Sequence, residues 1–368
     1  MKQTKISGLQ LLYVMVGYQL GTAMILGIGP QAKQDAWAVV VIGMFSGLIL
    51  MGVYVKLAAH YPDDTLVQII PRIIGKYLSY PIIIMYIFHF TYSAARACRE
   101  LGDLLTSSIL ISTPNVVVIG FFMVLMLYCL HGGVETFGRM GELVFPVYIF
   151  SLIVIWILLL TIEQFDFNNL SPILGNGVKP VLQEAFPQNI NFPFGETIIF
   201  MMFFPFLKSK GKVMQLSMTG ILIGGMLLTV NSIMMISTLG PEIYKKEFFL
   251  LLSAARMVSI ADFLERFDAL VILLMVTGVF LKVGGFTFGA AVAITQLFKL
   301  TSPIVILLPL FTIITPLALI SGTSYVEHLE IGTKIFVPYF HTVLQIIIPV
   351  LLLCIAFIRK KFNLGNSR

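Results

Sequence analysis

The first apolar run, residues 9–28, limits the fold more than any other feature of the sequence. It reads LQLLYVMVGYQLGTAMILGI, twenty residues of which none is charged. At a rise of about 1.5 Å per residue, a helix of this length spans about 30 Å, the thickness of the hydrocarbon core of a bilayer. We therefore expect a helix that crosses a membrane.

Three glycines interrupt this run, and polar residues lie beside the middle one, Gly21. Glycine lowers helix stability by about 1 kcal/mol relative to alanine. A break at bilayer depth leaves backbone groups that lipid cannot satisfy, so it is tolerated only where the backbone lines a cavity or is buried in protein. We predict a small-molecule pocket formed in part by Gly21, Thr22 and Ala23. The alternative is that the glycines only let helices pack closely, which is common in membranes.

The composition extends this interpretation to the whole chain. Of its 368 residues, 58% are hydrophobic and 11% are charged, and the mean hydropathy is +0.96. The apolar runs are too long for the strands of a membrane barrel. The sequence therefore predicts an all-α polytopic protein whose main partner is the lipid bilayer.

The charges and the cysteines exclude other classes of partner. The net charge of +6 is spread over the loops between apolar runs, so we expect no nucleic-acid partner. The three cysteines fall in or near separate spans without the spacing of a metal site, which predicts neither a metal nor a disulfide. The sequence also lacks HExxH, phosphate-loop and GxSxG motifs, so we expect neither a cofactor nor an enzyme.

Ten spans are expected, with a more polar segment, 162–191, after the fifth. They cover residues 9–28, 36–57, 77–105, 115–130, 142–161, 192–207, 213–239, 267–298, 303–321 and 335–358. We divide the chain into a first five-helix repeat (1–162), a connecting external loop (163–191), a second five-helix repeat (192–358) and a basic tail (359–368).

The sixth span is predicted to be interrupted like the first. It is short, and it carries Glu196 near its outer end and Pro205 near its inner end. Proline in a helix interior removes a hydrogen bond and kinks the chain, so we expect the break on the inner side of Glu196. Interrupted helices at corresponding positions of two halves indicate the binding site of a transporter. With five helices in each half, the two repeats enter the membrane in opposite directions.

Basic residues set the expected orientation. With the N-terminus inside, fourteen Lys and Arg residues fall in inner segments and seven in outer loops. Inner loops of membrane proteins carry the excess of Lys and Arg, so both termini are predicted to be cytoplasmic. Two loops, 65–75 inside and 247–265 outside, have helical periodicity and are expected to lie on the membrane surface.

Lys282 is the charge predicted deepest in the membrane. Each intramembrane charge costs at least about 2.5 kcal/mol on insertion scales. Gly278, Lys282, Gly285 and Gly289 are four, three and four residues apart, which places them on one helical face. We predict that Lys282 meets the broken first helix as a fixed cation or a proton-titrating site. A lysine reaching toward the surface is disfavoured by this depth.

Glu196 is the second candidate binding residue. It can bind the ammonium of a zwitterionic ligand while backbone N–H groups at a broken helix bind the carboxylate. The alternative is a carboxylate that caps the helix or pairs with an arginine. Ile199, Phe200 and Phe203 of the same span complete the predicted pocket. Their bulk indicates a modest volume, which fits an amino acid better than a hexose.

The third span carries a cluster of four charges at its outer end. Arg96 and Glu100, like Arg99 and Asp103, are four residues apart and can pair on one helix. A solvated or structurally paired helix end is the favoured interpretation, and the alternative is that this cluster forms an outer vestibule gate. The histidines within spans, His89 and His341, are expected to hydrogen-bond between helices.

Four stretches resemble the B subunits of spore germinant receptors, a branch of the amino acid–polyamine–organocation superfamily. They read PFGETIIFMMFFPFL (193–207), GVFLKVGGFTFGAAVAITQLFKL (278–300), ACRELGDLL (97–105) and IIIPVLLLCIAFIRKK (346–361). The resemblance implies the LeuT-like fold, an inverted five-plus-five repeat of ten helices with broken first and sixth helices. Glu196 and Lys282 fall at that family's polar positions. Where relatives have Gly-x-Gly in the first helix, this chain has Ala23 in place of the second glycine.

The same resemblance implies a function. Such proteins sense a small nutrient germinant in the inner membrane of dormant spores, together with an A subunit and a lipoprotein C subunit. We expect ligand binding to favour one arrangement of the broken helices. The first alternative is a proton-coupled amino acid permease in which Lys282 titrates. The second is a channel subunit, although no span carries a ring of charges or a filter-like repeat.

Overall fold

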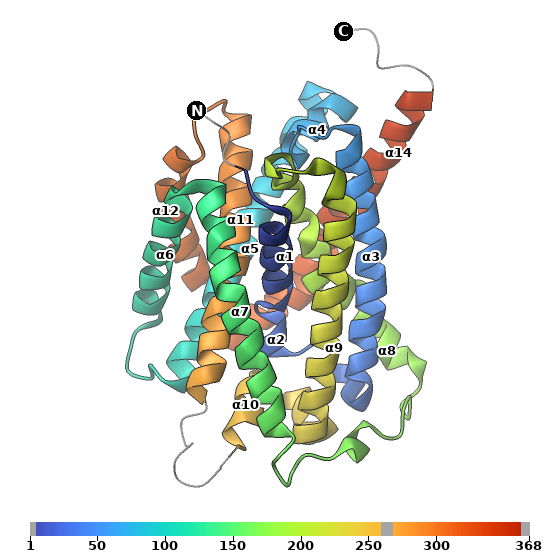
Figure 1. The fold of residues 1–368 in the computed structure, drawn as a ribbon, viewed down its shortest axis with the longest axis vertical. Coiled ribbons are helices and arrows are strands. Elements are labelled where there is room, and N and C mark those ends of the chain that lie inside the picture. The colour runs from blue at the N-terminus through green and yellow to red at the C-terminus, as the bar shows by residue number, and fades with distance from the viewer. Residues whose placement is uncertain (1–4, 259–267, 362–368) are drawn as a thin grey trace.

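The computed structural model describes residues 5–258 and 268–361, and this part of the chain is almost entirely helical (Figure 1). The elements of the first half are α1 (Gly8–Leu20), α2 (Ala23–Leu26), η1 (Pro30–Asp35), α3 (Ala36–His60), α4 (Leu66–Ile74), α5 (Lys76–Ser108), α6 (Asn115–His131) and α7 (Gly133–Leu159). Those of the connecting segment and the sixth span are η2 (Phe167–Leu170), α8 (Val178–Glu184), η3 (Ala185–Phe194), η4 (Gly195–Met202), η5 (Phe204–Phe206) and η6 (Lys210–Lys212). The remainder are α9 (Val213–Lys246), α10 (Leu250–Arg256), α11 (Asp268–Leu297), α12 (Ile304–Ile320), α13 (Tyr325–Ile331), η7 (Gly332–Ile347) and α14 (Ile348–Lys361).

Most of the expected spans are long apolar helices. Among the described residues, seven helical stretches are long and apolar enough to cross a membrane. Two shorter apolar helices, α6 and α12, have 17 residues each, which is the lower limit for a span. The sixth expected span, 192–207, consists of short helical segments instead of one helix. The chain is therefore a multi-pass integral membrane protein.

Several boundaries differ from the expected ones. Helix α7 begins at Gly133 instead of near residue 142, and its polar first turns carry an ion pair of 2.6 Å between Arg139 and Glu135. The connecting segment holds a short helix, α8, where a loop was expected. The inner amphipathic helix α4 has Thr65 and Gln68 as a reciprocal cap, and its apolar face is buried against α5 and α14. The outer one is α10; residues 259–265 of that predicted helix lie outside the described residues.

The first helix is interrupted at Gly21, as we predicted. Helix α1 ends at Leu20, Gly21 has non-helical backbone angles (φ −2°, ψ −112°), and Thr22 precedes the four-residue α2. A close helix crossing accompanies the break, because a Cβ atom on Gly278 would lie 3.1 Å from the Cα atom of Gly21. The chain therefore both breaks and packs closely at this point, and the predicted pocket at Gly21, Thr22 and Ala23 stays a prediction.

The break of the sixth span lies on the outer side of Glu196, which corrects the expectation. Phe192 is extended (φ −118°, ψ 121°), and the helical segment that carries Glu196 follows it. Proline disfavours helical geometry in the residue before it and fits the first turn of the next helix, so Pro193 is compatible with the break. Pro205 lies inside the short segment Phe204–Phe206 and leaves the chain helical there.

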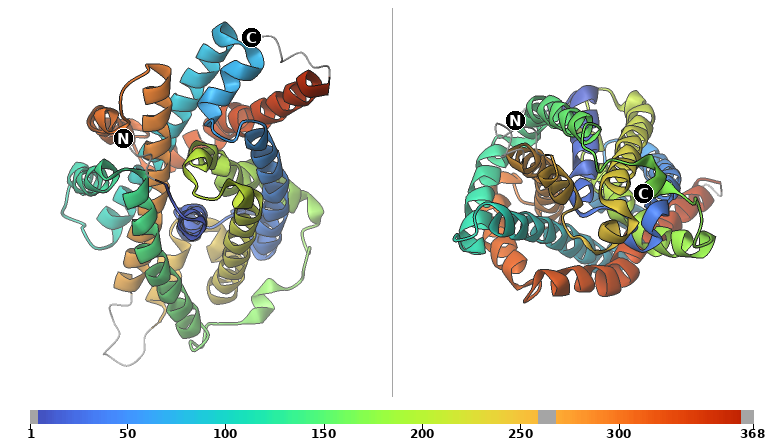
Figure 2. Two further views of the ribbon diagram at one scale, coloured as in Figure 1. Left: turned by 45° about the horizontal axis from the view of Figure 1, so that its top comes forward. Right: turned by 90° about the horizontal axis from the view of Figure 1, so that it is seen from below.

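Helix α1 lies in the middle of the bundle (Figure 2). It packs against α7, α9 and α11, while α11 also packs against α5 and α3 against α9. The residues of α1 from Val14 to Leu20 are all buried. The interrupted helix is thus surrounded by long helices. Protein covers the backbone groups that the break exposes, and these groups could not form hydrogen bonds with lipid.

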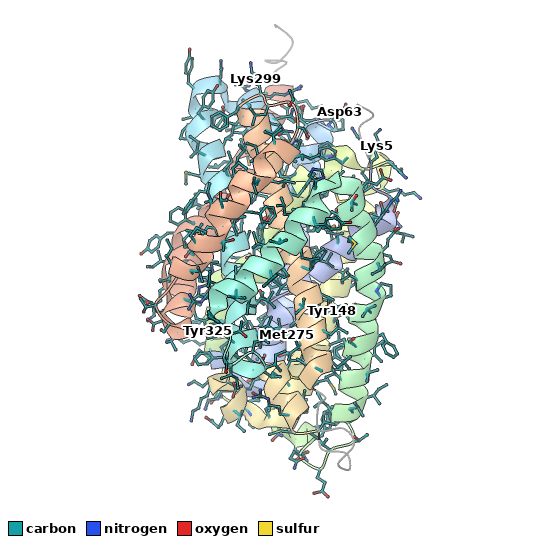
Figure 3. The ribbon with its side chains drawn as sticks, turned by 90° about the vertical axis from the view of Figure 1, so that its left-hand side faces the viewer. Lys5, Asp63, Tyr148, Met275, Lys299 and Tyr325 are labelled. Carbon is teal, nitrogen blue, oxygen red and sulfur yellow. The ribbon has the colours of Figure 1, made fainter. Side chains whose placement is uncertain are left out.

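Both ends of the described chain lie at the same end of the bundle. Ile6 exchanges backbone hydrogen bonds with the segment around Leu207, through Ile6 N–H to the Phe206 carbonyl (2.9 Å) and Lys208 N–H to the Ile6 carbonyl (3.0 Å). Near the other end of the chain, Arg359 donates to the carbonyl of Arg72 (3.1 Å). Figure 3 shows Lys5, Asp63 and Lys299 at this end of the molecule, where Lys210 pairs with Asp63.

Candidate ligand-binding site

An ion pair between α11 and the sixth span lies where both interrupted helices meet. The Nζ atom of Lys282 is 2.7 Å from Oε2 of Glu196, and the two side chains are 3% and 5% exposed. The same ammonium donates to the hydroxyl of Thr22 (3.2 Å), at the break of the first helix. Lys282 therefore meets the break of the first helix, as predicted, and its partner there is the side chain of Thr22.

Aromatic rings surround this ion pair. The ammonium of Lys282 lies 4.2 Å from the ring centre of Phe192, within the range of a cation–π contact. Tyr18 donates from its hydroxyl to the backbone carbonyl of Glu196 (3.2 Å). Two ions taken out of water are stable only when such contacts satisfy them, so the geometry fixes the position of α11 against both broken segments.

The glycines near Lys282 serve close packing. A Cβ atom on Gly21 would lie 3.2 Å from Cδ of Lys282, and one on Gly285 would lie 3.1 Å from the ring of Tyr18. A Cβ on Gly278 would also approach the ring of Tyr148 to 2.9 Å. The predicted glycine face of α11 therefore lets α1 lie directly against the lysine side chain.

A cavity of about 510 Å³ extends from this ion pair toward the end of the molecule that carries Lys245 and Lys246. Lys282, Glu196 and Phe192 form its inner end. Helix α5 and segment η7 contribute much of the wall. Its volume is in the usual range for sites that bind small molecules.

The charges of the cavity wall balance. Its basic residues are Arg96, Lys245, Lys246 and Lys282, and its acidic residues are Glu100, Glu184, Glu196 and Glu247. At the outer part of the wall, burial raises the pKa of Glu184 above its ordinary value of 4.5, opposed by a hydrogen bond from the Gln31 backbone. Equal numbers of the two signs favour a ligand without net charge.

Not all predicted pocket residues reach the cavity. Ile199, Phe200 and Phe203 are buried in the core; Phe200 packs edge-on against Tyr18 and Phe203 packs against Phe288. Their expected place in the pocket is corrected, because the chain breaks at Phe192 and these residues therefore lie beyond the inner end of the cavity.

The first-helix residues lie beside the cavity and not in its wall. Gly21 and Thr22 contact Lys282, whereas Ala23 is buried next to a separate small void bounded by Leu228 and Asn231. The role of Gly21, Thr22, Glu196 and Lys282 in binding a ligand stays a prediction.

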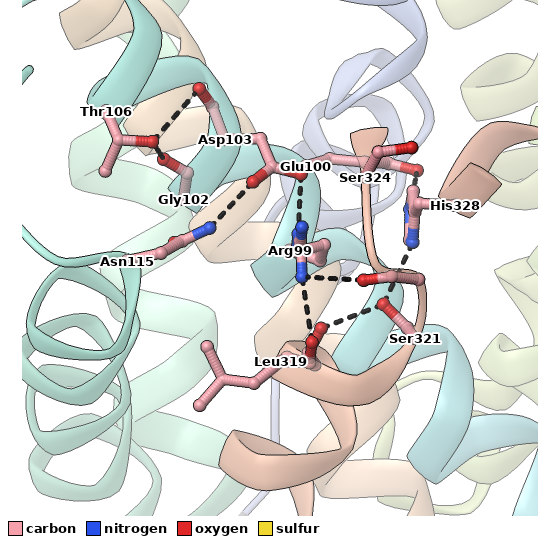
Figure 4. A network of polar contacts seen from close by, with 12 residues as sticks. Arg99, Glu100, Gly102, Asp103, Thr106, Asn115, Leu319, Ser321, Ser324 and His328 are labelled. Atoms are coloured by element: carbon pink, nitrogen blue, oxygen red, sulfur yellow. Dashed lines mark hydrogen bonds and ion pairs between the residues drawn. The ribbon is translucent and has the colours of Figure 1, made fainter. Parts of the chain in front are cut away.

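Arg99, with Asp103 and Asn115, forms a network of hydrogen bonds that holds the C-terminal end of α12 against α5 (Figure 4). Arg99 donates to the carbonyls of Leu319 (2.9 Å) and Gly322 (3.3 Å), and its Nε atom lies 2.6 Å from Asp103. Asn115 also donates to Asp103 (2.7 Å). These contacts support the structurally paired helix end that we favoured over a gate at this residue.

Glu100, by contrast, lines the cavity with Arg96. Its Oε1 atom lies 3.9 Å from Arg96 and 3.7 Å from Nε2 of His328, while Arg96 donates to the His328 carbonyl (2.9 Å). The two histidines expected to hydrogen-bond between helices meet between α5 and η7, where the ring centres of His89 and His341 are 4.8 Å apart. His89 contacts Gln345 through Nε2 (3.3 Å), whereas neither ring nitrogen of His341 has a partner among the described residues.

Several residues of the cavity wall were not predicted to line it. Ser93 and Ala97 lie on the same face of α5 as Glu100, at helical spacing, and this periodicity was a usable signal. Asn189 and Phe192 belong to a segment assigned to a loop and to the edge of a span, and His341 lies far away in the sequence. No local pattern connects these residues.

Comparison with solved structures supports the fold. The crystal structure of MhsT in complex with L-phenylalanine superposes with a TM-score of 0.65 over 95% of this chain and 88% of that chain, at 12% identity. A likeness at this identity shows the fold alone, and that fold is the LeuT-like transporter fold expected from the resemblance.

Comparison with sequences gives the family. The family model described as spore germination protein matches residues 5–326. Spore germination protein KB of Bacillus subtilis (strain 168) is 30% identical over 362 residues, 98% of this chain and 97% of the relative. Spore germination protein YndE of the same organism is 25% identical over 80% of this chain and 82% of its own length. This agreement over nearly the full length confirms the resemblance seen in the four stretches, and the chain belongs to the spore germination protein family.

Proposed function

We propose that this protein is the germinant-sensing subunit of a spore germinant receptor and binds a small zwitterion, an amino acid, at the Lys282–Glu196 ion pair. The observation that carries the proposal is that this pair, almost fully buried, forms the inner end of a cavity of about 510 Å³. Charged side chains buried within the membrane-spanning part of a protein indicate a functional site.

The chemistry of the pair favours an amino acid over a sugar. Separating Lys282 from Glu196 leaves two unpaired buried ions, each of which costs several kcal/mol. An amino acid can supply a carboxylate to Lys282 and an ammonium to Glu196, so both charges stay paired. A hexose supplies neither. Helix α2 has only four residues, which is too short for its N-terminus to bind a carboxylate strongly. We therefore propose the ammonium of Lys282 as the carboxylate site.

Signalling follows from where the pair is anchored. Lys282 belongs to α11, Glu196 to the sixth span, and Thr22 to the break of the first helix. A ligand that replaces the direct ion pair changes how these three segments are held. To move a two-state equilibrium from 1:99 to 99:1, its affinities for the two states must differ by about 5.5 kcal/mol. We propose that A and C subunits of the receptor detect the change.

The proposed orientation uses the basic end of the bundle. Lys5, Lys210, Lys299 and Arg359 lie at the end where the chain starts and finishes, and we place this end in the cytoplasm. The cavity then opens to the outer side of the spore inner membrane or the cell membrane.

A proton-coupled amino acid permease is the second candidate function. The likeness to the fold of a protein solved with bound L-phenylalanine favours it. It differs from the first proposal in one measurable respect, because a permease accumulates its ligand inside a vesicle whereas a sensor only binds it.

The test is thermal unfolding of the purified full-length protein with single amino acids and simple sugars. A ligand at 100 times its Kd adds about 2.7 kcal/mol of stability. We expect saturable stabilisation by an amino acid, lost in Lys282→Ala and Glu196→Gln and retained in Glu330→Gln, a variant of an exposed ion pair. Uptake into vesicles that an uncoupler abolishes would establish the permease instead, and stabilisation by sugars alone would refute the zwitterion.

A further inference from the structure

Besides Glu196 of the ion pair, three buried polar side chains line the cavity and have at least one atom without a hydrogen-bond partner. They are Ser93 (Oγ), Asn189 (Oδ1) and His341 (both ring nitrogens), between 2% and 4% exposed. Within residues 5–258 and 268–361, no protein group satisfies these atoms. Buried polar atoms are nearly always hydrogen-bonded, so several unsatisfied atoms in one cavity indicate a polar occupant.

Neighbouring groups hold two of these side chains in place. Asn189 donates from its amide nitrogen to the carbonyl of Val39 (2.5 Å), which leaves its oxygen as a free acceptor. The ring of His341 packs edge-on against His89, with ring centres 4.8 Å apart, and against Phe336 at 5.9 Å. Their polar atoms are therefore preorganised before any ligand binds.

These residues are separate from the ion pair but belong to the same cavity. Ser93 lies on α5, three residues before Arg96, and His341 lies on η7, which contacts α5. Asn189 precedes Phe192, the residue whose ring covers Lys282. An amino acid whose ammonium and carboxylate occupy Glu196 and Lys282 would direct its side chain into the remaining space, where these groups form part of the wall.

We propose that Ser93, Asn189 and His341 form a subsite that selects the side chain of the ligand. Asn189 offers an acceptor, a neutral imidazole offers one donor and one acceptor, and a hydroxyl offers both. The complementary ligand carries a neutral side-chain group that both donates and accepts, a hydroxyl or a carboxamide. An aliphatic side chain of equal size would leave these polar atoms unsatisfied.

This inference rests on the proposed function, and pairs of isosteric amino acids test it. The probes are L-threonine against L-valine and L-asparagine against L-leucine, titrated into the purified full-length protein with thermal unfolding as readout. A site built to hydrogen-bond a polar side chain discriminates strongly against the analogue that lacks it. We expect at least about fivefold tighter binding of the polar member of a pair.

Two variants localise the selectivity. Ser93→Ala removes a hydroxyl that makes no hydrogen bond to a described protein group, so folding is expected to be unchanged while the threonine-to-valine ratio falls severalfold. His341→Phe keeps the ring and removes both nitrogens, with the same expected direction. The matched control is Ser217→Ala, since Ser217 is also a buried hydroxyl without a partner but does not line the cavity.

The outcomes separate the two proposals. Equal affinities for both members of each pair, with binding still dependent on Lys282, would overturn the subsite and leave the proposed function standing. An equal loss of affinity for threonine and valine in Ser93→Ala would also overturn it. If no amino acid stabilises the wild-type protein, both proposals fail. Should His341→Phe not fold, the ratio measured for Ser93→Ala decides alone.

Discussion

Lys282 on α11 and Glu196 behind the break of the sixth span lie 2.7 Å apart, and each has almost no exposed surface. The two residues lie on different segments that are far apart in the sequence, so the pair forms only when the chain folds. Replacement of one partner of a buried pair by an apolar residue leaves an uncompensated charge, whereas replacement of both partners leaves an apolar contact.

The first prediction uses this asymmetry. We expect Lys282→Met to lower the free energy of unfolding by about 3–5 kcal/mol, and the double variant with Glu196→Leu to regain most of that loss. Chemical unfolding in detergent measures both. Single variants of the exposed pair Lys334–Glu330 serve as controls and should change stability little. Equal losses in the single and double variants would show that the pair is not the element that holds these segments.

The second prediction concerns the crossing of α1 and α11. A methyl group on Gly278 would meet the Cα atom of Gly21 at 3.1 Å and the ring of Tyr148 at 2.9 Å. Overpacking of this kind costs about 1–3 kcal/mol, so Gly278→Ala should destabilise the protein and weaken ligand binding. Gly120 on α6 has open space around it, and Gly120→Ala should be neutral or slightly stabilising. If the two variants unfold alike, the crossing does not depend on Gly278.

Sequence patterns predicted those parts of the fold that depend on local chemistry. The length and apolar character of the runs gave the spans, Gly21 gave the first break, and the spacing of Gly278 and Lys282 gave the face of α11 that meets it. Each of these features follows from hydrophobicity or helix geometry within one segment, so it can be read without knowing the neighbours.

The second break could not be located in this way. The tripeptide Phe-Pro-Phe occurs twice in the sixth span, at 192–194 and 204–206. The first copy contains the extended Phe192, and the second stays within helical turns. Identical local sequences thus have different conformations, and the surrounding protein decides which proline ends a helix. The cavity wall escaped prediction for the same reason, since Ser93 and His341 come together only in the folded chain.

The third prediction is a pH dependence from Glu184. Burial in the cavity wall raises the pKa of this carboxyl above 4.5, so its contribution to stability is complete below pH 4.5 and is lost as pH rises through the folded-state value. Because glutamine does not ionise, Glu184→Gln prevents this loss of stability at higher pH. The variant should therefore gain stability relative to wild type between pH 4 and pH 7, measured by unfolding midpoints at intervals of one pH unit. The exposed Glu163→Gln is the control, and a pH-independent difference for Glu184→Gln would contradict the prediction.

The fourth prediction concerns the inner end of the broken helices, where Ile6 pairs with the backbone around Leu207 and the Leu207 side chain is fully buried. In a Cys354→Ser background, in which Cys98 and Cys129 are buried, Leu207→Cys should resist a membrane-impermeant thiol reagent. Ile6→Pro removes the N–H that donates to Phe206 and should raise the labelling rate at least severalfold. Ser209→Cys, at an exposed position, should react at the same rate with and without Ile6→Pro.

The same labelling experiment separates a sensor from a permease. Alternating access in transporters requires the inner end to open during each cycle, so a transported amino acid should raise the labelling of Leu207→Cys. A sensor needs only the binding step, and its ligand should leave the Ile6–Leu207 pairing closed while it still stabilises the protein. Because Ile6→Pro gives the rate of the opened state, the ligand-bound rate can be read as a fraction of it. A fraction near zero supports the sensor, and a fraction that rises with ligand concentration to a plateau supports the permease.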